Sequence, residues 1–576
     1  MKRDNKFLKK EFQKALFPVM ISVLGGTVNA LIDSAFVTRR LDSDALAAVG
    51  LTMPIFLVLC TVGCLFAQGG SVAASRSLGK NDKETAGQYY NTSVLMMVIA
   101  SVVFMVAGLF GSHFIASLLC NDPILLPMVE EYGRITLMGS AAFILICIPS
   151  YYLQLDGKGK YLSIMMGVVI LTDIIFDYLF LFVFDLGVRG ASLASVISVL
   201  LATIYGFTRL QTGKGIFKVN LSLFKIANLK EIVMFGSTSA IGNLFDVIRL
   251  AVLNWILYIA GGAGALAVWT VLNSLLELSL CITTGVPRTA SPLLGIYLGG
   301  YDNEGARMIV DTEIKLGLAL SVIYAGILAV FHHQIGEFFK LDSGLLFPMI
   351  CLGISVIFEL IATVLSSYFN VAKRIMLSDF IMFLETLFFP LLFAAIFLVC
   401  GVPIWLFLPF GMGAVVLVTL LVVWAIARRS RGETHELSSV LLLDRYTETT
   451  NRVKGFSVLS SDEAICKASE DITEFCIENN MDVKTAKRIG LAMEEVMTVM
   501  ARKSLKNEND PVDVRVFSLD GVFGISIMCS GTRYDLFQEA EDSDDDFHMG
   551  VQMINKMAEA CIYIYTLGMN VLSVVF

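Results

Sequence analysis

Apolar residues gather in long runs up to about Arg431, and charged residues fall between these runs. A helix needs about 20 residues to cross about 30 Å of hydrocarbon. The runs therefore predict an all-α polytopic membrane protein with twelve spans. The spans are expected near 15–38, 45–72, 88–118, 129–153, 161–184, 188–210, 231–259, 263–292, 308–332, 346–370, 377–399 and 402–427.

The two halves of this region repeat one another. A motif that begins at Ala45 recurs at Ala265, with every matching position displaced by 220 residues. Six spans duplicated in parallel, with a binding site expected where the halves meet, are typical of an alternating-access transporter. A channel or a membrane enzyme is the alternative. The further matching pairs are Leu78 and Leu298, Gly79 and Gly299, Asp82 and Asp302, Glu84 and Glu304, and Ala86 and Ala306.

Composition separates this region from the rest of the chain. The whole chain is 56% apolar and 16% charged, whereas soluble proteins have roughly 25% charged residues. Residues after about Arg431 are more polar and hold much of the net charge of −8, which predicts a second, soluble domain. We expect an N-terminal six-helix half at 1–218, a C-terminal half at 219–431, a linker at 432–450 and a soluble tail at 451–576.

The loops between the spans alternate in charge. One set is rich in Lys and Arg, while the opposite set carries Arg39, Arg40, Arg189 and Lys340. This asymmetry predicts a multi-pass protein of the plasma membrane with both termini in the cytoplasm. The basic N-terminus lacks a small-residue cleavage site and is expected to lead into the first span rather than to be a removable signal peptide.

Metal and cofactor chemistry has no clear motif. The eleven cysteines occur without a CxxC pair or a metal-ligand spacing and are expected to be reduced packing residues. The acidic segment "EAEDSDDD" at 539–546 also lacks ligand spacing and is predicted to be a solvated, mobile loop. We therefore predict no metal, no organic cofactor and no nucleic-acid partner.

Carboxylates inside the apolar runs are the leading functional candidates. Asp33 and Asp177 lie about 28 Å and 26 Å beyond the last basic residue before them, at about 1.5 Å per residue, and thus reach the same depth. Asn29 and Asp173 lie one turn away from them. Clustered carboxylates in low dielectric repel one another, so at least one is expected to exchange protons near neutral pH and to bind H⁺ or Na⁺. The alternative is that Asp33 marks the outer interface and Asp173 caps a kink.

The second half carries its charges in different places. Asp246 and Arg249 are three residues apart and are predicted to neutralise each other as an intramembrane pair. Together with Glu277 they are candidates for a substrate cavity, because buried acids suit cationic ligands. Structural ion pairs and helix-end positions are the alternative. Four more charged residues are expected to be dispersed over other spans: Arg288, Glu359, Asp379 and Glu385.

Three segments, taken in order, resemble the multidrug and toxic compound extrusion (MATE) family. They are "ALFPVMISVLGGTVNALIDSAFVTRRLDSDALAAVGL", "SRSLGKNDKETA" and "TDIIFDYLFLFVFDLGVRGASLAS". The resemblance covers about residues 8–428. It implies an antiporter that exports organic, often cationic, compounds in exchange for H⁺ or Na⁺, so that the lipid bilayer and small organic cations are the expected partners.

The resemblance also implies roles for single residues. Asp33 matches the family's first-span acid, and Pro18 matches the proline near which that span bends when the acid is protonated; a proline lowers the cost of bending. Asp177 matches the acid of an Asn-x-x-x-Asp-Pro pattern, but Asp173 stands in the Asn place and Tyr178 in the Pro place. The extra acid offers a second cation ligand or titrating group, which leaves H⁺ and Na⁺ both open.

The tail has the pattern of a small α/β domain, an α+β sandwich. We predict a strand at 452–459, helices near 462–480 and 483–505, a hairpin turning at Asp520-Gly521, a helix from Gly550 and a last hairpin ending at Phe576. This order resembles the histidine-kinase-like ATPase fold in its anti-sigma-factor kinase branch. The second helix, "RIGLAMEEVMTVMARKS", carries the most specific part of that resemblance.

The same resemblance places a degenerate nucleotide site in the tail. Glu495 matches the Glu of the family's Glu-x-x-x-Asn, but Val499 replaces the Asn that holds Mg²⁺. The adenine-binding Asp-x-Gly appears as Cys529-Ser530-Gly531, and the Gly-x-Gly of the lid as His548-Met549-Gly550. Valine cannot ligate a hard cation. We therefore expect no ATP hydrolysis or kinase activity and at most weak nucleotide binding.

Two roles stay open for the tail. It is either a regulatory module that binds a cytoplasmic protein or a nucleotide, or a folded remnant that stabilises the carrier. An ATP-driven pump is disfavoured because the chain has no Gly-x-x-x-x-Gly-Lys-Ser/Thr loop. The main rival for the substrate is a flippase of lipids or lipid-linked precursors of the same superfamily. A flippase is expected to need a strongly basic cavity, whereas the intramembrane charges here are mostly acidic.

Overall fold

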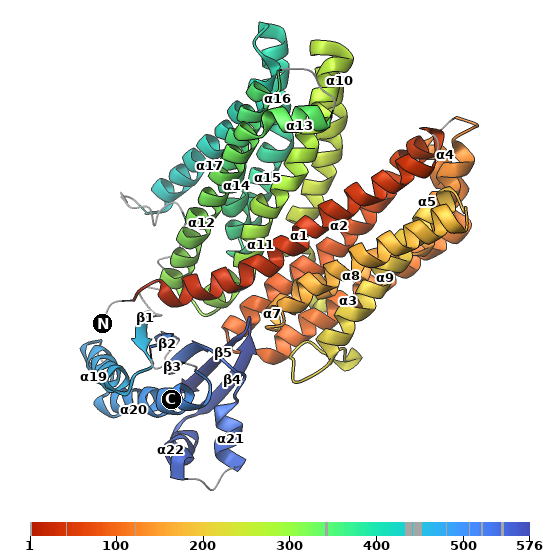
Figure 1. Ribbon diagram of the computed structural model, residues 1–576. Helices are drawn as coiled ribbons and strands as arrows, with labels where there is room; N and C mark the ends of the chain where they lie inside the picture. The colour runs from red at the N-terminus through yellow and green to blue at the C-terminus, as the bar shows by residue number, and fades with distance from the viewer. Residues whose placement is uncertain are drawn as a thin grey trace.

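A large bundle of helices carries a small α/β domain at one end in the computed structural model of the chain (Figure 1). The structure describes residues 3–41, 43–120, 122–339, 344–431, 441, 452–479, 481–505, 507, 509–519, 522–542 and 546–576.

Long helices build the membrane region. The first half contains α1 (Lys6–Arg40), α2 (Ser43–Gly79), α3 (Lys83–Phe110), α4 (Ser112–Leu119), α5 (Leu126–Met138), α6 (Ser140–Leu145), α7 (Cys147–Leu155), α8 (Lys160–Asp177) and α9 (Val188–Gln211). The second half contains α10 (Leu229–Thr283), α11 (Gly285–Gly299), α12 (Asn303–Val330), α13 (His332–Phe338), α14 (Leu346–Val371), α15 (Ile375–Phe383), α16 (Phe389–Cys400) and α17 (Phe407–Arg431).

The span count agrees with the prediction. Among the described residues, eleven helices are long and apolar enough to cross a membrane, and a bent pair would make twelve. That pair is the predicted fourth span, whose two parts, Leu126–Met138 and Ser140–Leu155, meet at 53° rather than forming one straight helix. The continuous α10 holds two spans, because the backbone leaves helical geometry at Gly261 and Gly262.

The repeated motif folds the same way in each half. Asp82 and Asp302 are helix N-caps whose side chains accept a hydrogen bond from the backbone three residues later. The residues before them, Asn81 and Tyr301, have φ angles of 63° and 58°. The repeat seen in the sequence is therefore a repeated α-turn-α unit in the structure.

The two halves lie against each other at the end that carries the tail and diverge toward the opposite end (Figure 1). We call the first of these the tail-side end. Glycines permit the close packing there, because a Cβ at Gly79 would lie 2.2 Å from the carbonyl oxygen of Ile296. The contacts between the halves include those of α1 and α2 from the first half with α10 and α11 from the second.

Two membrane helices contain a turn of π-helix beside a buried carboxylate. The helix α8 continues after Asp177 into a π-turn at Tyr178–Val183, and α15 continues into a π-turn at Leu384–Phe388 that includes Glu385. Such turns are rare and occur frequently at functional sites. The two π-turns therefore mark α8 and α15 as candidate positions for a functional site.

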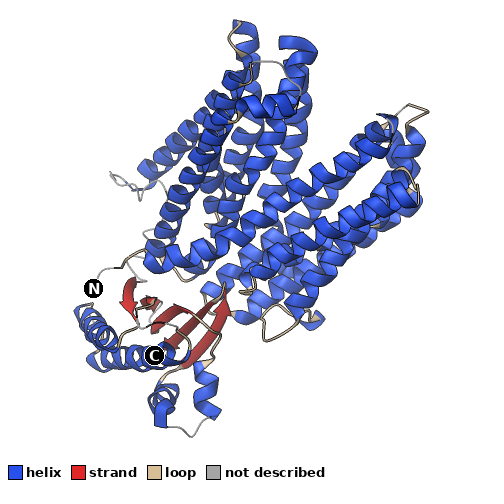
Figure 2. Cartoon of the chain, viewed as in Figure 1, coloured by secondary structure: helices blue, strands red, loops and turns tan. Residues whose placement is uncertain are grey.

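The tail is one antiparallel sheet with helices packed on one face (Figure 2). The strand order is β1-β2-β3-β5-β4. The predicted strands and helices are present, and the turn expected at Asp520-Gly521 lies outside the described residues. The elements are β1 (Arg452–Leu459), α19 (Asp462–Glu478), α20 (Val483–Lys503), β2 (Pro511–Leu519), β3 (Val522–Ser530), α21 (Leu536–Asp542), α22 (Met549–Met557), β4 (Ala560–Thr566) and β5 (Met569–Val575).

One prediction for the tail is wrong in part. The acidic segment at 539–546 was expected to be a loop, but its first part lies in α21, which ends at Asp542. Leu536, Phe537 and Ala540 are buried, so an apolar stripe at helical spacing outweighs the repulsion between the acids. Residues 543–545 lie outside the described part of the chain.

Candidate functional site

Asp33, Asp173 and Asp177 lie close enough to interact electrostatically, as their depths in the sequence predict. They come from α1 and α8, which pack along each other. Asp173 and Asp177 have no solvent-exposed surface. Tyr132 of α5 also lies within electrostatic range of all three carboxylates. Tyr132 could not be singled out beforehand, because a single tyrosine in an apolar span is ordinary.

Two donors hold Asp173 in place. The Asn29 amide donates a hydrogen bond of 2.9 Å to one carboxylate oxygen, and the Ser198 hydroxyl donates one of 2.8 Å to the other. Asp173 is therefore a satisfied carboxylate within α8 and does not cap a kink. Ser198 comes from α9 and was not among the predicted site residues, since serines are common in membrane helices and its partner lies 25 residues away.

Asp177 differs from Asp173 in its surroundings. Both of its carboxylate oxygens, and one oxygen of Asp33, are buried and accept no hydrogen bond from any described residue. Nearby Arg40 does not compensate Asp33, because its guanidinium pairs with Asp185 at 2.8 Å. A buried carboxylate without a partner is costly unless it is protonated or binds a cation. Asp33 and Asp177 thus have free ligand atoms that face one site.

Pro18 lies inside α1, below the carboxylates and next to α8. The hydroxyl of Ser163 in α8 donates a hydrogen bond of 3.2 Å to the Pro18 carbonyl. The same two helices are joined at Asn29 and Asp173. The helix that holds the carboxylates therefore contacts α1 both at the acid site and at the position where α1 can bend most easily.

The second half contains a separate charged cluster. Asp246 and Arg249 form the predicted ion pair at 2.7 Å. Glu359 and Glu385 lie within electrostatic range of that pair, and Thr363 donates a hydrogen bond of 2.9 Å to Glu385. The two glutamates lie on different spans, as expected, but the packing of α10, α14 and the π-turn after α15 brings them together, which the sequence did not predict.

The Glu277 carboxylate has its hydrogen-bond partner outside this cluster. Its side chain accepts a hydrogen bond of 3.3 Å from Asn273, one turn away on the same helix. Thr27 of α1 donates a hydrogen bond of 3.4 Å to the Glu277 backbone carbonyl. Glu277 therefore marks a contact between the two halves. Of the remaining charged residues, Asp379 accepts a hydrogen bond from Thr238, and Arg288 stacks on Tyr151 at 4.2 Å.

The comparisons with known proteins concern the membrane region. The MatE family model matches residues 18–179, which contain Pro18 and the carboxylate cluster. A solved structure described as the outward-facing conformation of a multidrug resistance MATE family transporter of the MOP superfamily aligns with a TM-score of 0.68. It is 22% identical and covers 73% of this chain and 96% of its own. The membrane region therefore has the MATE fold and is similar to MATE family transporters.

Curated relatives of the chain include the multidrug export protein MepA of Staphylococcus aureus (strain NCTC 8325 / PS 47). It is 24% identical over 324 residues, which are 56% of this chain and 71% of MepA. A MOP superfamily transporter from Pyrococcus furiosus, whose structure is described as having a binding pocket of reverse polarity, aligns with a TM-score of 0.68 and 21% identity. That match covers 74% of this chain and 97% of the other.

The tail has no family assignment, and its predicted nucleotide site is filled by its own atoms. A Cβ at Gly550 would lie 2.0 Å from a carboxylate oxygen of Glu495, so the lid position packs directly on that acid. Burial raises the pKa of Glu495, and the neighbouring Glu494 raises it further. Val499 is buried in the core between helices and sheet.

The remaining residues of that site point elsewhere. Ser530 lies beside Glu11 of α1, on the sheet face opposite to α20. Gly531 has a φ of 135° and packs against Ser504. The structure thus brings Glu495 and Gly550 together but directs Ser530 toward the membrane region.

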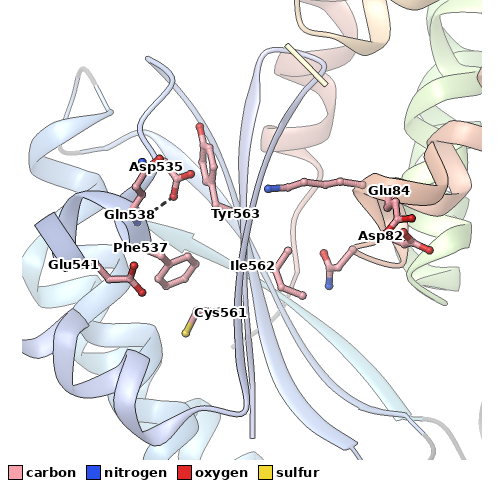
Figure 3. A pocket seen from close by; sticks show the side chains of 11 residues that line it. Asp82, Glu84, Asp535, Phe537, Gln538, Glu541, Cys561, Ile562 and Tyr563 are labelled. Atoms are coloured by element: carbon pink, nitrogen blue, oxygen red, sulfur yellow. Dashed lines mark hydrogen bonds between the residues drawn. The ribbon is translucent and has the colours of Figure 1, made fainter. Parts of the chain in front are cut away.

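A surface cavity of about 510 Å³ lies between the tail and the first half (Figure 3). The connection between α2 and α3 forms one wall, and α21 with β4 forms the other. Its lining includes Asp82, Glu84, Asp535, Glu541 and Tyr563. This cavity is remote from the carboxylates of α1 and α8. No group of three or more His, Cys, Asp or Glu side chains among the described residues has the geometry to hold a metal ion.

Proposed function

We propose that the chain is a secondary antiporter of the MATE type that exports organic, mainly cationic, compounds in exchange for H⁺ or Na⁺. The observation that carries the proposal is the pair Asp33 and Asp177, which have buried oxygens without hydrogen-bond partners beside a third carboxylate. A proton or a sodium ion would supply the missing partner. The choice of substrate is supported by MepA, which is named a multidrug export protein, and by the outward-facing solved structure, which is described as a multidrug resistance transporter.

Ion binding is proposed to act through α1. Neutralising Asp33 or Asp177 removes the repulsion between these carboxylates and changes which hydrogen bonds they make. Because α1 contacts α8 at Asn29 and at Pro18, a shift at the acids is transmitted to the proline position, where α1 bends at low cost. Occupancy of the ion site would thereby alter the shape of the space between the halves.

The substrate is proposed to bind between the halves, near the acids of the second half. Asp246 is half-exposed although its partner Arg249 is mostly covered, and the carboxyl groups of Glu359 and Glu385 lie behind them. The exposed part of the Asp246 carboxylate offers an acidic contact that suits an organic cation. Both termini, and hence the tail-side end, are proposed to lie in the cytoplasm, because the loops on that side are the basic ones.

The test is transport in liposomes that contain the full-length protein. A fluorescent organic cation is loaded, and an H⁺ gradient or a Na⁺ gradient is imposed separately. Wild type is compared with Asp33→Asn and Asp177→Asn. Asp185→Asn is the matched control. It removes a carboxylate that follows α8 and its π-turn, but this carboxylate is exposed and already paired with Arg40.

We expect one of the two gradients to drive cation movement in wild type and in Asp185→Asn, and neither to do so in Asp33→Asn or Asp177→Asn. Coupled transport that persists in both variants would refute the role of the carboxylates. If no gradient moves any cation but a fluorescent lipid crosses the bilayer faster with the protein, the flippase alternative replaces the antiporter.

A further inference from the structure

One face of the tail's sheet is built to contact the membrane region. Strand pairing aligns Asp513, Met528, Val571 and Ile564 across four strands, and these side chains share a face. Met528, Ile564, Met569 and Val571 belong to the same hydrophobic core as the membrane helices. We call this the docking face. It consists of Ser457, Asp513, Arg515, Ser526, Met528, Ile564, Thr566, Met569, Val571 and Ser573.

The docking face contacts the first half through short polar bonds. The Thr566 hydroxyl and the Leu567 backbone N–H both donate to the carbonyl of Leu155, at 2.7 Å and 3.1 Å, at the end of α7. Ser573 donates a hydrogen bond of 3.1 Å to the side chain of Asn81, between α2 and α3. The tail is thereby attached to two connections of the first half.

The same face contacts the second half. The Tyr297 hydroxyl of α11 donates a hydrogen bond of 2.9 Å to Asp513. The guanidinium of Arg515 lies over the Tyr297 ring, 5.5 Å from its centre. Both aspartate and arginine are buried, so these contacts form in a site from which water is largely excluded. The tail therefore bridges the two halves at the tail-side end.

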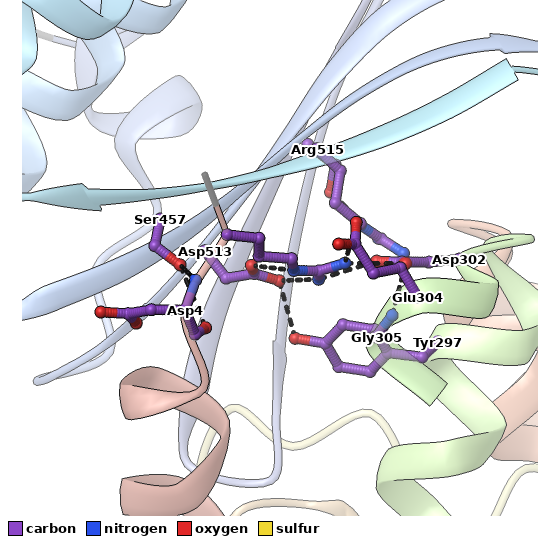
Figure 4. Close-up of polar contacts among 10 residues, drawn as sticks. Asp4, Tyr297, Asp302, Glu304, Gly305, Ser457, Asp513 and Arg515 are labelled. Atoms are coloured by element: carbon purple, nitrogen blue, oxygen red, sulfur yellow. Dashed lines mark hydrogen bonds and ion pairs between the residues drawn. The ribbon is translucent and has the colours of Figure 1, made fainter. Parts of the chain in front are cut away.

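Arg3 fastens this bridge by joining Asp302 and Asp513, the two carboxylates that Figure 4 labels. Its guanidinium, fully buried, donates two hydrogen bonds of 2.8 Å and 2.9 Å to Asp302 of the second half. It donates two more, of 2.9 Å and 2.6 Å, to Asp513 of the tail. Such paired bonds between an arginine and a carboxylate are strong and geometrically specific. Burial lowers the pKa of Arg3, but the two carboxylates outweigh burial and raise it above its ordinary value.

Opening of the tail-side end would break this arrangement. The first half, held through Leu155 and Asn81, and the second half, held through Tyr297 and Asp302, cannot separate while one rigid sheet contacts both. We propose that the tail is a clamp that stabilises the closed tail-side end and has to release one half during each transport cycle. This inference rests on the proposed antiporter function with alternating access, and it concerns how that access is regulated.

The test measures the distance between the halves in the full-length protein without substrate or gradient. Spin labels are placed at Lys214→Cys in the first half and Arg307→Cys in the second, both exposed. The exposed Cys400 and Cys466 are replaced by serine to avoid background labelling. Docking is read separately by hydrogen exchange at the Leu567 amide, because that amide donates its bond directly to the first half.

Asp513→Asn is the principal variant, and Tyr297→Phe is a milder one that keeps the ring and should fold even if the first does not. Glu474→Gln is the control, because it removes an exposed carboxylate from the outer helix of the tail. We expect Asp513→Asn to increase the ratio of long to short distances about tenfold, the size of one lost charge-assisted hydrogen bond. Tyr297→Phe should increase the ratio of long to short distances by a smaller factor. Glu474→Gln should leave this ratio unchanged.

The outcomes separate the clamp from the transport model. If exchange at Leu567 accelerates in the release variants but the distances stay as in wild type, the tail docks without clamping and the inference is overturned. If the distances never change, in any variant and at any ion concentration or pH, alternating access itself fails. Distances that vary with ions in wild type, but identically in all tail variants, would also overturn the clamp while leaving the antiporter intact.

Discussion

Gly79 and Gly299 occupy equivalent positions in the two repeats, and each packs against the backbone of the other half. A Cβ at Gly79 would lie 2.2 Å from the carbonyl oxygen of Ile296, and one at Gly299 would lie 2.2 Å from that of Arg76. Ile296 and Arg76 are themselves equivalent, separated by the same 220 residues. The halves thus meet through one contact made twice, as expected for two related units around an approximate two-fold axis.

Gly299→Ala is predicted to weaken this contact. The added methyl group has no room, because its neighbours are backbone atoms that cannot rotate away. The expected cost is about 1–3 kcal/mol of stability, seen as a lower melting temperature of the purified protein in detergent. Gly79→Ala should behave alike.

The control for this substitution is Gly326→Ala in α12, where nothing lies within 4 Å of the added Cβ. It should leave the melting temperature unchanged or raise it slightly, because alanine favours helix by about 1 kcal/mol over glycine. Equal melting temperatures for Gly299→Ala and wild type would show that the halves do not need this close approach.

Ser198→Ala is predicted to weaken ion binding. The substitution removes one of the two hydrogen bonds that hold Asp173, and misplaces a carboxylate beside Asp177. Loss of a group that orients a ligand typically costs about 10- to 100-fold in ion affinity. The measurement is the concentration of coupling ion that gives half-maximal transport in liposomes, with the maximal rate largely retained.

Thr208→Ala, on the same helix α9, is the matched control, because its exposed hydroxyl donates a hydrogen bond to the backbone carbonyl of Tyr205, away from the carboxylates. It should require the same ion concentration as wild type. A shift of equal size in both variants would mean that the effect comes from the helix and not from Asp173.

The tail is predicted to neither bind nor hydrolyse ATP. Gly550 packs on Glu495 where a nucleotide would lie, and the buried Val499 offers no ligand for Mg²⁺. Purified full-length protein should release no phosphate from Mg-ATP, and its melting temperature should not rise with millimolar nucleotide. Saturable binding of a fluorescent ATP analogue, lost in Glu495→Gln, would contradict this prediction.

Much of this arrangement follows from the sequence, because apolar runs and helical depth are local properties. The fold class and the number of spans, apart from the bend in the fourth, follow from the lengths of the apolar runs. The similar depth of Asp33, Asp173 and Asp177 follows from counting residues along single helices. Ser198 was missed because a polar residue in a span does not reveal which helix it faces. For the same reason, the gathering of Glu359 and Glu385 around Arg249 could not be anticipated.

The docking of the tail lay further beyond the sequence. Arg3 and Asp513 are 510 residues apart, and neither stands out from the other charges in its segment. Their pairing depends on which face of the sheet the β2 side chains occupy. It also depends on how the sheet lies against the tail-side end of the membrane region. Docking also explains the departure at Ser530, which the family resemblance placed in a nucleotide site but which lies on the face that contacts α1.

The most direct test of the central claim is the release of ions when substrate binds. Purified full-length protein in weakly buffered detergent solution is mixed with a fluorescent organic cation, while protons are followed with a pH indicator and bound radiolabelled Na⁺ is counted in parallel. Wild type and Asp185→Asn should release one of the two ions as the cation binds, whereas Asp177→Asn should bind the cation and release neither. Release by Asp177→Asn equal to that of wild type would contradict the assignment of Asp33 and Asp177 as the coupling-ion site.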